Sequence, residues 1–139
     1  MIDNDLIMKD AGLVASSAAA TVDSSAQVVD VGEGLVKGEL VIDVTAIEIA
    51  DDDELFKISL QGSSKSDFSD TYEDLAIIEL GAKEELGGDQ DSETGRYVVP
   101  FRTERNGTVY DHLRVYTTVS GTVGTGINFK AYLRPQTKQ

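Results

Sequence analysis

The chain has 139 residues and a mass of 14.9 kDa, which is the size of one domain, and its 40% hydrophobic residues are enough to fill one core. It contains no cysteine, so disulfide bonds and a cysteine-ligated structural zinc are excluded. The formal net charge of −13 argues against binding to nucleic acid or to an acidic membrane, because like charges repel at long range.

The start of the chain predicts synthesis in the cytoplasm. Met1 to Asp5 is acidic where a signal peptide is basic, and the apolar run Leu6 to Met8 is too short for its hydrophobic segment. Elsewhere the uncharged apolar runs are far below the roughly 20 residues that span a bilayer.

Residues 1–25 are predicted to form an N-terminal arm, and residues 26–139 the β domain. The arm has two apolar clusters, Leu6 to Met8 and Leu13 with Val14. They precede the stretch Ala15 to Thr21, whose small side chains bury little surface. We therefore expect the arm to lie outside the core.

Period-2 alternation then recurs between turn signals, which is typical of an antiparallel sandwich or barrel. The predicted strands are Ala26 to Val31, Glu39 to Ile49, Leu55 to Gln61, Leu75 to Leu80, Arg96 to Phe101, His112 to Val119 and Ile127 to Arg134. Glycines and an Asn-Gly pair separate most of them. With a short arm strand, this predicts an all-β fold: a single antiparallel β-sandwich or jelly roll of about eight strands.

The alternation also predicts which side chains are buried. In the second strand, Leu40, Ile42, Val44 and Ala46 share one face, which we expect to face the core. The face of Val41 is expected to be the outer one. The next strand alternates in the same way, with its apolar side chains on the core face.

Charge is unevenly distributed along the chain. Residues 1–95 carry a formal charge of −18, and residues 96–139 carry +5. Basic C-terminal strands can neutralise acidic ones within the sheets of one subunit. The alternative is that one of these surfaces meets a complementary surface on another protein.

Catalytic motifs are missing, and we expect neither enzymatic activity nor a cofactor. His112 is the only histidine, so a pair of histidines for metal binding or acid–base chemistry is excluded. Asp111 is expected to point to the opposite strand face and so not to orient the imidazole. The sequence has no nucleophile elbow and no phosphate-binding loop.

Two acidic clusters remain alternatives for calcium. Asp51 to Glu54 has the charge without the alternating ligand spacing. Asp89 to Glu93 reads D-x-D-x-E but is followed by Thr94, where an EF-hand loop has glycine. We predict solvated loops at both and no metal site. Sugar hydrolysis lacks its usual stacking platform, because the chain has no tryptophan.

An ordered set of short motifs runs through nearly the whole chain. It comprises Met1-Ile2-Asp3 with Leu6-Ile7-Met8 and Asp10-Ala11, the stretch Val14 to Val22, Val28 to Gly32, Ile58 to Ser63 with Asp67 to Ser69, Tyr97 to Phe101, and Leu113 to Thr122. In this order the motifs resemble the small jelly-roll cement, or decoration, proteins of tailed bacteriophage capsids, of the type known from a Bordetella phage. The loops 51–54 and 83–95 are more acidic than that family leads us to expect.

The resemblance implies a non-enzymatic structural protein of the virion, made in the bacterial host and located on the outer capsid surface. Its partners would be the major capsid protein, whose neighbouring subunits it would staple together, and further copies of itself, as a homodimer or alternatively a homotrimer. The expected capsid-binding anchors on the arm are Met1, Ile2, Leu6, Ile7, Met8, Leu13 and Val14. Burial of such side chains on a neighbour gains about 25 cal/mol per Å² of apolar area. The alternative is a carbohydrate- or host-binding β module of a phage tail or fibre.

Overall fold

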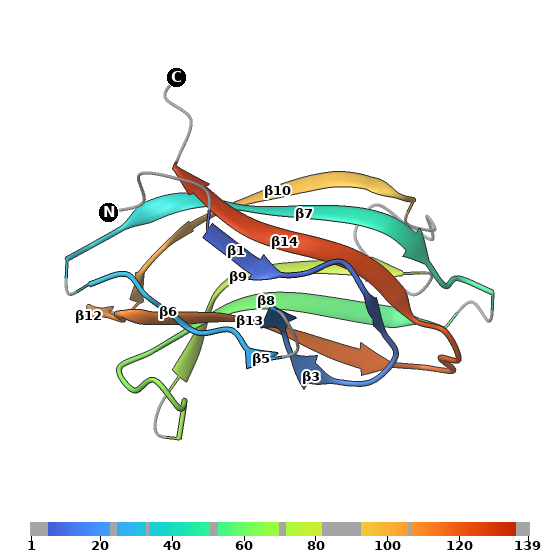
Figure 1. The fold of residues 1–139 in the computed structure, drawn as a ribbon, viewed down its shortest axis with the longest axis horizontal. Coiled ribbons are helices and arrows are strands. Elements are labelled where there is room, and N and C mark those ends of the chain that lie inside the picture. Colours follow the sequence, from blue (N-terminus) through green and yellow to red (C-terminus); the bar gives the residue numbers. More distant parts are fainter. Residues whose placement is uncertain are drawn as a thin grey trace.

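The computed structural model describes residues 6–22, 25–32, 34–50, 53–69, 72–81, 93–105 and 107–135. These residues form strands and their connections only (Figure 1). The strands are β1 Leu6–Lys9, β2 Leu13–Val14, β3 Ala18–Ala19, β4 Thr21–Val22, β5 Ser25–Ala26, β6 Val29–Asp30, β7 Lys37–Ile47, β8 Leu55–Ser63, β9 Tyr72–Gly81, β10 Gly95–Arg102, β11 Glu104–Arg105, β12 Thr108–Val109, β13 His112–Ser120 and β14 Ile127–Pro135. The predicted all-β class is confirmed.

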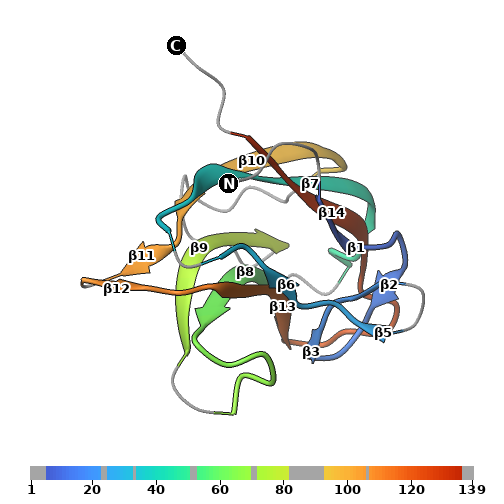
Figure 2. The same ribbon diagram turned by 60° about the vertical axis from the view of Figure 1, so that its left-hand side comes forward.

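Two antiparallel sheets face each other across the core (Figure 2). The first has the order β1-β14-β7-β10, with β2 also paired to β14. The second has the order β3-β13-β8-β9, with β6 also paired to β13. Two short pairs, β4–β5 and β11–β12, complete the described strands. The largest fully buried side chains come from both sheets and include Phe56, Ile58, Leu113, Phe129 and Leu133.

The long strands lie close to their predicted positions. The predicted strands that begin at Glu39, Leu55, Leu75, Arg96, His112 and Ile127 correspond to β7, β8, β9, β10, β13 and β14. The predicted strand Ala26 to Val31 is instead two short strands, β5 and β6. These pair with different partners, β4 and β13, so the chain changes neighbour within this segment.

The predicted alternation holds along most of β7 but fails at two positions. Leu40, Ile42 and Val44 are buried as expected, whereas Ala46 is exposed. The pairing of β14 with β7 shifts beside Val44, so that Thr45 forms a bulge, and one extra residue reverses the facing of those that follow. Val41 is fully buried although it lies on the outer face. Its strand is central, and neighbouring strands flank it on both sides.

The N-terminal segment packs on both sheets. β1 and β2 pair with β14, and β3 pairs with β13, so residues 6–22 cross from one sheet to the other (Figure 2). Met8 is fully buried and Ala20 is 5% exposed, both within the main hydrophobic cluster. The expectation that this segment lies outside the core is therefore wrong for these two residues. The period of two in β1 explains the burial of Met8, because Leu6 and Met8 turn inward while Ile7 turns outward.

Candidate partner-binding surface

The predicted anchors of the arm separate into an inward and an outward set. Met8 lies in the core of its own chain, so it is not available to a partner in this structure. Leu6 and Val14 are half-buried and pack against the same core. Ile7 and Leu13 are 54% and 57% exposed. Met1 and Ile2 lie outside the described residues. The outward pair is the part of the predicted site that a second protein can reach.

Leu13 borders an apolar hollow of about 540 Å³, which we call the Leu13 groove. It lies between β2, the end of β7 and the start of β14, and Ala46, Ile47, Ile49 and Ala50 line it with Glu48, Thr125, Gly126 and Asn128. The buried Oδ1 atom of Asn128 has no hydrogen-bond partner. An open groove of mainly apolar lining suits an apolar side chain of a partner.

The wall of the Leu13 groove is the loop between β13 and β14, which two carboxylates fix. Oε1 of Glu48 accepts hydrogen bonds from the N–H groups of Gly124, Thr125 and Gly126 at 3.0, 2.7 and 2.8 Å. These bonds, that from Gly126 foremost, lower the pKa of Glu48 below its usual value. Asp53 accepts from the N–H and hydroxyl of Thr122 at 3.0 and 2.9 Å. These hydrogen bonds stabilise the loop, and the side chain of Val123 also packs against the core.

Lys9 ties the turn between β1 and β2 to the sandwich. Its Nζ donates to the carbonyl oxygens of Asp10, Gly12 and Phe129 at 3.0, 3.0 and 2.7 Å and lies 4.3 Å from the centre of the Phe129 ring. The side chain is buried, and this burial lowers the pKa of Lys9 from 10.5 to about 8, against the opposing effect of the nearby Asp10.

Behind this turn the segment is loosely packed. A hollow of about 460 Å³ lies between residues 9–16 and 18–21 and Thr117 of β13. Most of the side chains around it are alanine, serine or glycine. The N-terminal segment is thus anchored at Lys9 and Met8, with room beneath the connection to β3.

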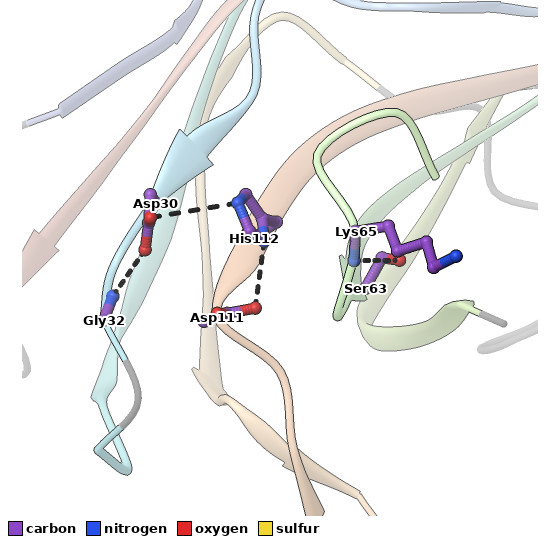
Figure 3. A network of polar contacts seen from close by, with 6 residues as sticks. All are labelled: Asp30, Gly32, Ser63, Lys65, Asp111 and His112. Atoms are coloured by element: carbon purple, nitrogen blue, oxygen red, sulfur yellow. Dashed lines mark hydrogen bonds and ion pairs between the residues drawn. The ribbon is translucent and has the colours of Figure 1, made fainter. Parts of the chain in front are cut away.

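His112 lies at the start of β13 between two carboxylates (Figure 3). Oδ1 of Asp111 is 2.9 Å from Nδ1, and Oδ2 of Asp30 is 3.8 Å from Nε2. The prediction that Asp111 points away from His112 is wrong, because β13 begins at His112 and strand alternation does not constrain the residue before it.

Asp30 is the residue opposite His112 on β6, and its Oδ1 accepts from the N–H of Gly32 at 2.9 Å. Ser63, opposite His112 on β8, accepts from the N–H of Lys65 at 3.1 Å (Figure 3). The contact between His112 and Asp30 joins the start of β13 to β6, whereas the Ser63 bond stays within the turn that follows β8.

The two acidic clusters are only partly within the described residues. Asp53 caps the β13–β14 loop, and Glu54 is fully buried. The neighbouring Asp51 and Asp52, and most of the stretch from Asp89 to Glu93, lie outside what the structure describes. Among the residues it does describe, no group of three or more histidine, aspartate or glutamate side chains is placed to hold a metal ion.

Sequence reasoning missed the Leu13 groove. The run from Ala46 to Ala50 is apolar except for Glu48, but the bulge at Thr45 that turns Ala46 outward depends on the pairing with β14. The buried Oδ1 atom of Asn128 without a hydrogen-bond partner likewise results from packing, which the sequence pattern does not predict.

A scan against models of known protein families finds no match to this chain, and a search of curated proteins finds no similar one. In the part of the chain that the structure describes, no helix has the length and apolar character needed to cross a membrane.

Proposed function

We propose that this protein is a non-enzymatic capsid cement protein with jelly-roll topology, which binds the outer surface of a tailed-phage head and staples neighbouring major capsid protein subunits. The observation that carries the proposal is the exposure of Ile7 and Leu13 on a segment that lies beside the apolar Leu13 groove. An exposed apolar side chain that borders an apolar groove, as Leu13 does, favours contact with another protein, and Ile7 adds a second exposed apolar side chain on the same segment. The ordered motifs supply the class of partner.

The size of the apolar contact fits a protein that acts in many copies. Full burial of a leucine or isoleucine side chain contributes about 1.5–3 kcal/mol, so Ile7 and Leu13 give one copy only modest affinity. A shell presents many identical sites, and a copy that spans two shell subunits makes its second contact at high effective concentration. Self-association, as a homodimer or a homotrimer, would raise the effective affinity in the same way.

The acidic character of the chain supports the same role. A formal charge of −13 keeps particles that carry many copies apart by electrostatic repulsion. It also disfavours adhesion to DNA released from neighbouring particles. The apolar anchors, which are uncharged, can still make contact at physiological ionic strength, where exposed charges are screened beyond about 8 Å.

The test is co-sedimentation of the purified protein with empty mature phage heads, with the melting temperature of the heads measured in parallel. The wild-type protein is expected to bind saturably and to raise that temperature. Ile7→Ser and Leu13→Ser should each weaken binding about tenfold, because each removes one apolar anchor. Ile77→Ser is the matched control, since Ile77 is 45% exposed but lies on β9 of the other sheet.

Equal binding by the Ile7, Leu13 and Ile77 variants would overturn the assignment of the binding surface. Failure of the wild-type protein to bind heads, together with a monomeric state in solution, would overturn the cement proposal. A carbohydrate array would then test the alternative of a tail or fibre module.

A further inference from the structure

We propose a second binding site, for an acidic extended polypeptide segment that carries an apolar side chain, in a groove at the end of β10. This groove, the β10 groove, has a volume of about 540 Å³, which is within the range of ligand-binding pockets. Leu75, Pro100 and Phe101 form its apolar part, and Lys37, Arg102, Glu104 and Arg105 form its charged part. Figure 2 shows this end of the molecule, where the β11–β12 pair projects beside β9.

The β10 groove concentrates positive charge on a strongly acidic chain. Three of its side chains are basic and one is acidic. Glu104 pairs with Arg102 at 3.3 Å, and neither Lys37 nor Arg105 meets a carboxylate within the described ranges. The other arginines of this sheet differ, because Arg96 and Arg134 pair with Asp43 and Glu39 at 2.7 and 2.8 Å.

The pairing of β10 with β7 places two of these cations face to face. Arg102 lies directly opposite Lys37 in the register. Like charges at directly opposed positions of an antiparallel pair destabilise it. A bound carboxylate would be attracted to both side chains and remove that cost. Binding of a negatively charged molecule would therefore stabilise this groove relative to its unbound state.

The apolar part of the groove favours a ligand that carries an apolar side chain as well as negative charge. Phe101 and Leu75 are 6% and 9% exposed and come from the two facing sheets, whereas Pro100 is exposed on the edge strand. An apolar side chain beside Pro100 would be desolvated between the basic residues. Pro100 has no N–H group to donate to an added strand, so the segment is held by side-chain contacts and not by extension of the sheet through this residue.

An acidic polypeptide fits the charge of this chain better than a nucleic acid does. The geometry of a guanidinium group allows two parallel hydrogen bonds to a carboxylate and to a phosphate alike, so geometry does not distinguish the two ligands. A nucleic acid, however, carries closely spaced negative charges along its whole length, and a protein of net charge −13 would repel them. A short segment with a few carboxylates meets the basic groove without that repulsion.

The β10 groove is separate from the Leu13 groove. The order β1-β14-β7-β10 places β10 at the opposite edge of the sheet from the N-terminal segment. The inference therefore goes beyond the capsid proposal and does not depend on it. A chain with both sites can contact two partners at once.

The test is fluorescence anisotropy with the full chain and a labelled peptide of alternating glutamate and leucine. The same peptide with glutamine in place of glutamate, and an oligothymidylate of equal length, are the comparison probes. We expect the acidic peptide to bind most tightly and its affinity to fall with added salt. Lys37→Gln and Arg105→Gln should each weaken binding severalfold, and the double variant about tenfold or more.

Lys130→Gln is the matched control for the single variants, because Lys130 is exposed on β14 of the same sheet and does not line the groove. It should change the affinity less than twofold. Thermal unfolding checks folding, and Lys37→Gln should not lower the melting temperature, because it removes the like-charge pair with Arg102.

Three results would overturn the inference: equal binding of the glutamine peptide, tighter binding of the oligothymidylate, or a double variant that binds the acidic peptide as the wild type does. None of them bears on co-sedimentation with heads. Failure of the two proposals is therefore distinguishable.

Discussion

At the scale of single residues, Lys9 shows how one buried charge holds a segment in place at a cost. Its ammonium group donates to three backbone carbonyl oxygens, those of Asp10, Gly12 and Phe129. Protonated Lys9 therefore fixes the β1–β2 turn but loses much of its hydration. This loss of hydration disfavours the charged form and lowers the pKa of Lys9 to about 8.

The low pKa of Lys9 makes stability depend on pH. Between about 8, the pKa in the folded chain, and 10.5, the ordinary value, the unfolded chain binds more protons than the folded one. Stability is therefore expected to rise with pH across this window, by at most about 3 kcal/mol. Denaturant unfolding at pH 8 to 10.5 measures it. Lys9→Met should abolish the Lys9 part of the rise, while Lys130→Met should keep it; equal slopes in both variants would contradict the assignment.

Glu48 has the opposite pH dependence. Its pKa is lowered by the N–H groups of the β13–β14 loop, so its contribution is present above its ordinary pKa and lost as the pH falls through the lower value in the folded chain. We expect the amides of Gly124, Thr125 and Gly126 to lose protection from hydrogen exchange on acidification. Glu48→Gln should expose these amides to exchange already at neutral pH, and Glu79→Gln, at an exposed position of β9, should not.

At the scale of elements, the contact between the β13–β14 loop and β2 decides how the N-terminal segment is placed. Gly126 has a φ of +91°, and a Cβ built there would overlap the carbonyl oxygen of Val14. Only glycine allows the two backbones to approach so closely. The two-residue pairing of β2 with β14 depends on that approach.

Gly126→Ala is therefore expected to lower the free energy of unfolding by more than about 1 kcal/mol and to displace β2 from β14. Gly124→Ala is the matched control in the same loop, since the nearest atom to its added Cβ is 3.9 Å away. Denaturant unfolding and proteolysis of the N-terminal segment measure the effects. If both variants behave alike, the close approach at Gly126 does not hold the segment.

At the scale of the whole molecule, one sheet has a different surface at each edge. The N-terminal segment borders the Leu13 groove beside β14, and the β10 groove lies at the far edge. The first is apolar and the second is basic with an apolar floor. Contacts with two different partners therefore need not compete for the same surface.

The sequence by itself determined the all-β class, the approximate positions of the six long strands and the inward face of two of them, with Leu40 and Ile42 on β7 and Phe56, Ile58 and Leu60 on β8. Period-2 patterning is local, and burial of one strand face imposes it directly. Only the tertiary structure decided that Thr45 forms a bulge, that Met8 is buried and that Asp111 meets His112. It also brought Lys37 beside Arg102 and Arg105. These features depend on register and packing between residues far apart in the chain, which local pattern does not specify.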